Sequence, residues 1–370
     1  MPTVSEIRAG LLSWAVANGI MADNIVVDTE GDVSLVPFPA NAVEFFRTRK
    51  IVRVVADEAT GALVLYSRLK IAEAKIRVLV NAFAERYENE QYRLRVDFTK
   101  PFKVDQHLES YGKHEPLRYH GQLIACGSSV GLGNQRNAGT LTALARRKGG
   151  DEMFGLSCNH VTGGCGTTRP GTPVVMPGIQ DVDEENAHIY VVGDHESVAE
   201  MRQGLPSVYD TTRNRDLAFF RLRDPAQLTS MQGSGQHAYD TPRYFENDVE
   251  PRMPVKKWGR STGFTTGEIT SINQDDEPIP YQVESFYGPM YSQTFKGTVY
   301  FHQVIEVAPD SSKPFSLGGD SGSLVVTNYR NKVERVVGIV IAGDRNKSIV
   351  LPIRDALAEY DLQLVFGHNV

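Results

Sequence analysis

Between Gly121 and Val350 the chain consists of many short runs of β-forming residues, and this pattern limits its fold more than any other feature. Clusters of glycine, proline, asparagine and aspartate separate the runs, which include GTLTALAR, FGLSCNHV, HIYVVG, LAFFRL, GEITSI, TVYFHQVIEV, SGSLVV and RVVGIVIAG. Short strands at this spacing predict a β-sandwich or a β-barrel. Helical spacing returns only at Ile353–Tyr360. We therefore expect a mainly β domain over residues 120–370.

The first hundred residues have a different character, because helical and strand patterns alternate there. We predict helices at Val4–Ala17, Ala40–Arg49 and Leu69–Tyr87, two short strands in Ile25–Val36, a hairpin over Lys50–Ser67 and a strand at Tyr92–Phe98. This is a small α+β domain over residues 1–105, followed by a polar, unpatterned linker at 106–119. The domain has no cluster of histidine, cysteine or acidic residues that indicates chemistry. We interpret it as a regulatory or partner-binding domain.

Composition argues against several classes of function. The net charge is −6, from 39 basic and 45 acidic residues that are interspersed, so we do not expect a nucleic-acid partner. No apolar run approaches the ~18–20 residues of a membrane span, so we expect no membrane partner. The N-terminal segment has acidic Glu6 before most of its apolar positions and lacks a basic region at its start, which indicates a helix and not a signal peptide.

Cysteine content favours a reducing compartment. The three cysteines, Cys126, Cys158 and Cys165, are an odd number and too few for a disulfide framework. We therefore expect a cytoplasmic protein. No motif in the chain indicates a cofactor or a metal requirement, and we expect none.

The stretch FSLGGDSGSLVV, from Phe315 to Val326, surrounds one serine with small residues directly before an apolar strand. Glycines at 318, 319 and 322 permit backbone conformations and close approaches that other residues resist. Such a turn is either an ordinary tight turn or a device that presents Ser321 beside bare backbone N–H groups. Acyl transfer by a serine also needs a base, and an acid that orients the base.

The β-rich half supplies a candidate for each of these roles. His160 lies at the end of the apolar run FGLSCNHV and is followed by a glycine-rich loop. Asp216 begins the otherwise apolar run DLAFFRL. The chain order is therefore His160, Asp216, Ser321.

These three segments resemble the catalytic blocks of chymotrypsin/trypsin-like serine peptidases, which have the same order. A further segment, WGRSTGFTTGEIT from Trp258 to Thr270, resembles a block of intracellular bacterial trypsin-like peptidases and of plant relatives of the narrow-leaf type. The resemblance covers roughly residues 120–355. It implies a chymotrypsin-like double β-barrel, preceded here by the small α+β domain.

The resemblance also implies roles for individual residues. Ser321 would be the nucleophile, His160 the general base and then acid, and Asp216 the orienting carboxylate. The backbone N–H groups of Gly319 and Ser321 would form the oxyanion hole. Asp320 would point inward and fix the turn.

Other interpretations of these residues stay open. Asp210, six residues before Asp216, is the rival carboxylate. Cys158, His160 and Cys165 can also be interpreted as part of a zinc site, although the chain lacks a second Cys-x-x-Cys pair and a convincing fourth ligand. The simpler interpretation of Cys158 is a small, buried apolar residue.

The same resemblance implies a substrate pocket. The position of its floor, six residues before the nucleophile, is Phe315, and its wall includes Ile341, Ala342 and Gly343. Phe315 cannot supply the carboxylate that cleavage after lysine or arginine needs, so we expect cleavage after small or medium apolar residues. Asp344, which follows Gly343, leaves a basic preference open.

Together these features predict a serine endopeptidase that hydrolyses peptide bonds through an acyl-enzyme. Its partners would be a protein or peptide substrate and a regulatory protein that binds residues 1–105. The alternative is a trypsin-fold binding or adaptor module with little or no turnover.

Overall fold

The computed structural model describes residues 4–17, 51–57, 62–67, 71–77, 93–98, 115–182, 188–204, 206–273, 276–288, 291–329 and 333–370. The chain divides into two compact units, residues 1–102 with 205–209 and residues 103–204 with 210–370. None of the described helices is long and apolar enough to cross a membrane. Most of the predicted linker, up to position 114, lies outside the described residues.

Among its described residues, the first unit contains helix α1, a helical segment at residues 73–77 and a three-stranded sheet. Helix α1 (Val4–Ala17) has the predicted bounds, because apolar side chains recur at helical spacing and are buried at Val4, Ile7, Leu11 and Trp14. The sheet has the order β1–β2–β3, with strands Ile51–Asp57, Ala62–Ser67 and Arg93–Phe98. The antiparallel pairing of β1 with β2 confirms the predicted hairpin, and β3 confirms the predicted third strand.

Three further predictions for this unit fall wholly or largely outside the described residues. The segments 25–36 and 40–49 lie outside the described part of the chain. Of the helix predicted over Leu69–Tyr87, residues 71–72 are not helical and residues 73–77 are helical, while the remainder lies outside the described part.

The second unit is mainly β. Its strands are β4 (Tyr119–His120), β5 (Leu123–Cys126), β6 (Ser129–Leu132), β7 (Gly139–Thr140), β8 (Leu144–Arg147), β9 (Met153–Ser157), β10 (Pro173–Met176), β11 (Tyr190–Val198), β12 (Ala218–Leu222), β13 (Leu228–Gln232), β14 (Tyr239–Asp240), β15 (Tyr244–Phe245), β16 (Pro254–Gly259), β17 (Gly263–Asn273), β18 (Glu277–Phe286), β19 (Ser292–Phe301), β20 (Val304–Pro309), β21 (Leu324–Thr327), β22 (Arg335–Gly343), β23 (Ser348–Leu351) and β24 (Leu362–Leu364). Two short helices, α4 (Asn159–Thr162) and α5 (Arg354–Glu359), also belong to it. The second confirms the helix predicted at the C-terminal end of the chain.

Six strands of this unit form a closed barrel. The order β22–β21–β16–β17–β20–β23 returns to β22, because β22 pairs with both β21 and β23. Strand β17 alternates buried and more exposed residues, as a strand with one face on a core must. Its buried Ile269 packs with Val307, Val325, Val340 and Phe315 in the interior of the barrel.

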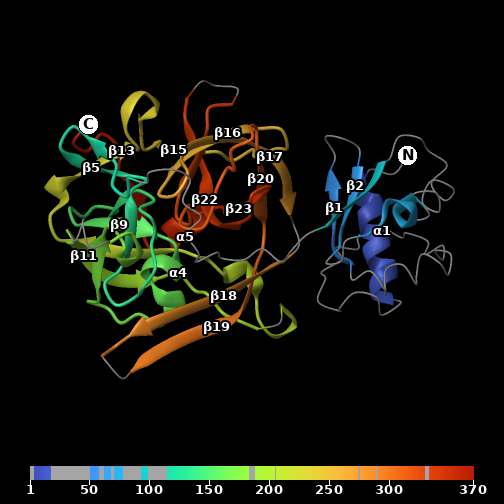
Figure 1. The fold of residues 1–370 in the computed structure, drawn as a ribbon, viewed down its shortest axis with the longest axis horizontal. Helices are drawn as coiled ribbons and strands as arrows, with labels where there is room; N and C mark the ends of the chain where they lie inside the picture. The colour runs from blue at the N-terminus through green and yellow to red at the C-terminus, as the bar shows by residue number, and fades with distance from the viewer. Residues whose placement is uncertain are drawn as a thin grey trace. The chain divides into compact units, whose positions relative to one another are not determined.

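The other half of the unit is a curled sheet of eight strands, in the order β24–β8–β9–β12–β11–β10–β6–β7, beside a four-stranded sheet, β14–β13–β5–β4. A closed barrel next to this half gives the chymotrypsin-like pair of barrels that the sequence motifs predicted, and that prediction is confirmed. The connection from β17 to β20 contains β18 and β19. They pair along their full length as a separate hairpin that extends away from the barrel strands (Figure 1).

Candidate active site

His160 and Asp216 meet where two neighbouring strands end. Strands β9 and β12 are antiparallel, and their last pair is Ser157 with Ala218. The chain leaves β9 and enters β12 at the same point, so the residues just outside the sheet lie side by side. The sequence predicted His160 at a strand end; it lies one step further on, in the single-turn helix α4.

The two side chains form a buried, two-point contact. Asp216 Oδ1 accepts the backbone N–H of His160 at 3.0 Å, and Asp216 Oδ2 lies 2.6 Å from His160 Nδ1. The histidine is 4% exposed and the aspartate is fully buried. This contact places the imidazole proton on Nδ1, so the other ring nitrogen, Nε2, can accept a proton.

Tyr281 is a third member of this cluster, and it comes from the β18–β19 hairpin. Its hydroxyl donates to Asp216 Oδ2 at 3.0 Å, and its ring centroid lies 5.3 Å from that of His160. Burial raises the pKa of the Tyr281 hydroxyl well above its usual value, so the group stays a donor. Asp216 therefore accepts three hydrogen bonds and is oriented from two directions.

Backbone contacts bring the Ser321 segment to the same place. The carbonyl of Val340 on β22 accepts two bonds: one from Gly322 N–H at 2.8 Å and one from Cys158 Sγ at 3.3 Å. Gly322 follows Ser321 and Cys158 lies two residues before His160, so one carbonyl joins both segments. Thr140 N–H also donates to the Ser321 carbonyl at 2.8 Å. Ser321 itself is partly exposed.

The peptide between Gly318 and Gly319 is held in one orientation. Ser261 Oγ donates to the Gly318 carbonyl at 2.5 Å, and Thr140 Oγ1 donates to the Gly319 carbonyl at 3.0 Å. In a planar trans peptide the C=O and the following N–H point in opposite directions. The Gly319 N–H therefore points away from Ser261. Gly319 has a φ of 92°, and the space for a Cβ there is taken by the guanidinium of Arg260.

Asp320 anchors the turn from inside, as predicted. Its carboxylate is fully buried and accepts from the backbone N–H groups of Leu317 and Ser261 at 2.9 Å and 2.8 Å, and from Thr262 Oγ1 at 2.7 Å. The ammonium of Lys257, also fully buried, lies 3.4 Å away. Burial acts to raise the pKa of Asp320, but the Lys257 charge and these hydrogen bonds outweigh it, and the pKa is lowered.

A second buried ion pair lies behind this turn. Arg260 is fully buried, and its Nε donates to Asp181 Oδ2 at 2.6 Å, while its Nη2 contacts Asp181 Oδ1. The Nη1 group donates to Ser261 Oγ at 3.0 Å. Asp181 belongs to the 3₁₀ turn Ile179–Asp181, which connects β10 to β11 in the curled sheet. The pair therefore joins the two halves of the unit next to Ser261.

Sequence reasoning missed Tyr281, Lys257, Ser261, Arg260 and Asp181. The sequence does contain one indication of two of these residues, because Arg260 and Ser261 lie in the motif Trp258–Thr270. The partners of these residues lie far away in sequence: Lys257 and Asp320 are 63 positions apart by their numbers, and no local pattern links them.

The rival carboxylate, Asp210, lies elsewhere. It is exposed, and its Oδ1 accepts the backbone N–H of Thr212 at 3.0 Å as the cap of the 3₁₀ turn Thr211–Arg213. The contact with His160 is made by Asp216.

The zinc interpretation has a partial geometric basis. Ligand atoms of Cys158, His160 and Asp216 lie within 4.8 Å of one another. Burial, however, raises the pKa of the Cys158 thiol well above its usual value, and the thiol donates to the Val340 carbonyl. Zinc binds the thiolate form of cysteine, which this environment disfavours. Burial likewise raises the pKa of Cys165.

The residues of the predicted substrate pocket lie on and beside β22. Ile341 and Ala342 are buried, and Gly343 is partly exposed at the end of the strand. The ring of Phe315 packs in the core of the closed barrel. Ser316, next in the chain, hydrogen-bonds Ser348 through the two hydroxyls at 2.5 Å. The pocket assignment stays a prediction.

No protein-family model and no curated protein matches the chain. Among solved structures it is similar to Thermobifida fusca Protease A, with a TM-score of 0.40 and 18% identity over 66% of this chain and 100% of that one. For a Nocardiopsis protease the TM-score is 0.40 and the identity is 18%, over 65% of this chain and 97% of that one. For Cellulomonas bogoriensis chymotrypsin the TM-score is 0.38 and the identity is 16%, over 65% of this chain and 97% of that one.

We predict that Tyr281→Phe lowers the free energy of unfolding by about 1–2 kcal/mol, because a buried carboxylate loses one donor. Urea unfolding measures this loss, and the NMR signal of the His160 Nδ1 proton should shift in the folded variant. Tyr300→Phe, on the same hairpin, is the matched control. An unshifted Nδ1 proton in Tyr281→Phe would show that Tyr281 does not act on the His160–Asp216 pair.

Proposed function

We propose that this chain is a serine endopeptidase that uses His160, Asp216 and Ser321. The supporting observation is the convergence on one carbonyl: Val340 binds the residue after Ser321 and a residue of the His160 segment. The buried His160–Asp216 contact supplies an oriented base at that place. The Gly319 N–H, directed away from Ser261, supplies an oxyanion donor together with the N–H of Ser321.

The mechanism follows from these positions. Nε2 of His160 takes the proton of Ser321 Oγ as the oxygen attacks the scissile carbonyl carbon. The resulting oxyanion is bound by the N–H groups of Gly319 and Ser321. His160 then gives its proton to the leaving amine, which leaves an acyl-enzyme that water hydrolyses by the same two proton transfers. Asp216 holds the imidazole in the required tautomer throughout.

A binding or adaptor module with the same fold is the second candidate. Such a module has no need for a histidine and an aspartate that are buried together beside a glycine-framed serine. The α+β unit is the part of the chain that this candidate would use for binding. We propose instead that residues 1–105 bind a regulatory partner of the peptidase. We also propose that the protein is cytoplasmic, which is consistent with three free, buried cysteines.

We predict that a fluorophosphonate probe labels the native protein at Ser321. Ser321→Ala and His160→Ala should each abolish labelling and lower kcat by ~10⁴-fold or more, with little change in the thermal unfolding midpoint. Mass spectrometry of the labelled peptide identifies the modified residue. Peptide cleavage at the wild-type rate by Ser321→Ala would rule out this mechanism, and a folded protein that is never labelled would favour the binding module.

The Lys257–Asp320 pair gives the proposed activity a pH dependence. Burial lowers the pKa of Lys257 to about 8, although the Asp320 charge opposes the shift. Above this pH the ammonium loses its proton and the carboxylate that holds the oxyanion turn loses its counter-ion. The pKa of Lys257 is lower in the folded state than in the unfolded state. Between pH of about 8 and the ordinary lysine pKa, the unfolded state therefore binds more protons at this lysine than the folded state does. Titration of Lys257 thus does not lower the free energy of unfolding as pH rises.

We predict that kcat/KM falls as pH rises through about 8, while the urea midpoint shows no matching fall. Lys257→Met should lack the step and should lower the free energy of unfolding by about 3–5 kcal/mol, because Asp320 is left as an unpaired buried charge. Lys296→Met, at an exposed lysine of β19, is the control. A Lys257→Met enzyme with full activity and the wild-type pH profile would contradict the role of this pair.

Substrate preference is proposed to be apolar, and the position of Asp344 supports this. Its Oδ1 accepts the backbone N–H groups of Asn346 and Lys347 at 2.8 Å and 3.0 Å, at an exposed turn between β22 and β23. One oxygen of the carboxylate is thus engaged by its own turn.

We predict that a peptide-library profile shows cleavage after small or medium apolar residues. The reason is that the proposed pocket positions Phe315, Ile341 and Ala342 are buried apolar residues, which cannot compensate a buried cation. Asp344→Asn should leave the profile unchanged. Strong selection for lysine or arginine that Asp344→Asn abolishes would place the specificity carboxylate at Asp344 and overturn the apolar preference.

A further inference from the structure

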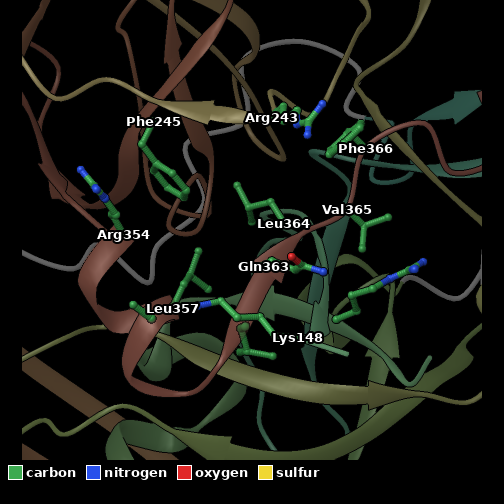
Figure 2. A pocket seen from close by; sticks show the side chains of 12 residues that line it. Lys148, Arg243, Phe245, Arg354, Leu357, Gln363, Leu364, Val365 and Phe366 are labelled. Carbon is green, nitrogen blue, oxygen red and sulfur yellow. The ribbon is translucent and has the colours of Figure 1, made fainter. Parts of the chain in front are cut away.

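A cavity of about 500 Å³ lies away from His160 and Ser321, between the C-terminal strand β24 and strand β15. Apolar side chains line it from several elements: Leu357 of α5, Leu364 and Val365 at β24, and Phe245 of β15. Figure 2 shows these side chains around the hollow, with Arg243 and Phe366 at one side and Arg354 at another. No residue named above for catalysis lines this cavity.

The polar part of the lining is basic. Arg146, Lys148, Arg243 and Arg354 line the cavity, and no aspartate or glutamate does. Among the described residues none of these four cations forms an ion pair, although the same unit contains many exposed pairs such as Arg223 with Asp194. Four cations around an apolar floor without counter-ions favour an anionic occupant.

The guanidinium groups of two of these arginines have distinctive surroundings. The Nε atom of Arg146 is buried and has no hydrogen-bond partner in the described part of the chain. The guanidinium of Arg243 lies over the ring of Phe366, 5.3 Å from its centroid, and 5.5 Å from that of Tyr244. Stacking orients a guanidinium and leaves its edge donors available.

The cavity also contains a strand edge. Strand β24 is the last strand of the eight-stranded sheet and pairs only with β8 within it. Lys148 N–H donates to the Asp361 carbonyl, and Val365 N–H donates to the Leu144 carbonyl. In an antiparallel pair the residues that bond the partner alternate with residues that point away. Positions 361, 363 and 365 therefore face β8, and the N–H and C=O groups of Leu362 and Leu364 face the open side.

We propose that this cavity binds an extended peptide segment in which acidic and apolar residues alternate. The segment would add to the free edge of β24 through its backbone, a known mode of peptide recognition. Its apolar side chains would share the face of Leu362 and Leu364. Arg146 and Lys148 lie opposite Gln363 and Asp361, so their side chains lie on the other face, and carboxylates on that face would meet these two cations.

An alternating peptide uses all three features of the cavity together, namely the strand edge, the apolar floor and the cations. A lone phosphate or a lipid headgroup would contact the cations and leave the edge of β24 unpaired. The edge is therefore what selects a peptide over other anions.

The test uses the full chain with Ser321→Ala, so that a bound peptide cannot be cleaved. The probe is a fluorescein-labelled, N-acetylated heptapeptide that alternates glutamate with leucine, and its affinity is measured by fluorescence polarisation at low and high salt. We expect saturable binding that weakens with salt. Arg146→Glu and Arg243→Glu should each weaken it about tenfold or more. Lys296→Glu, at an exposed strand lysine outside the cavity, should not change it.

The contribution of the strand edge is tested with a second peptide. The same heptapeptide with N-methyl groups on alternate residues cannot pair with β24 in one register and should bind about tenfold more weakly. Absence of binding, or binding that neither charge reversal nor N-methylation weakens, would overturn the proposal. The proposal would also be overturned if the peptide does not bind while anionic phospholipid vesicles do, and if Arg146→Glu and Arg243→Glu abolish the vesicle binding. None of these outcomes depends on peptidase activity.

Discussion

The carboxylate of Asp216 is the point where three distant parts of the chain meet. It accepts the backbone N–H of His160, contacts the imidazole of the same residue, and accepts the hydroxyl of Tyr281. A fully buried carboxylate is tolerated only when its lone pairs are satisfied. The end of β9, the start of β12 and the β18–β19 hairpin must therefore come together for the fold to hold this charge. The proposed base is oriented by the same contacts that satisfy the buried charge.

Charge is also used to hold the Ser321 turn. Lys257 and Asp320 are both fully buried, and their attraction offsets the desolvation of Lys257 only in part, which is why the Lys257 pKa remains low. The Arg260–Asp181 pair acts one step further away, because Arg260 donates to Ser261, and Ser261 orients the Gly318 carbonyl. The direction of the Gly319 N–H thus depends on charges from both halves of the unit. Such pairs specify one arrangement and add little net stability.

The two ends of the eight-stranded sheet have different roles in this account. At one end, β7 carries Thr140, whose backbone and hydroxyl contact Ser321 and Gly319. At the other end, β24 has no strand partner on its second side and lies beside cations without a counter-ion, as far as the described residues go. A closed barrel has no such edge. The six strands that close the barrel offer no such edge, so the proposed peptide would add to the open half of the unit.

The sequence by itself determined the mainly β character of the second unit, the bounds of α1 and the three residues proposed for catalysis. These follow from short-range signals: strand alternation, helical spacing, and glycines around a serine. Tertiary structure excluded the rival acid, Asp210, by placing it in a cap of its own turn, and it added Tyr281, Lys257 and Arg260. Each of these added contacts joins residues separated by tens of positions, and such pairings are set by which strands neighbour one another in the folded barrels. Local sequence patterns cannot predict these pairings, because the pairings depend on the packing of the whole unit.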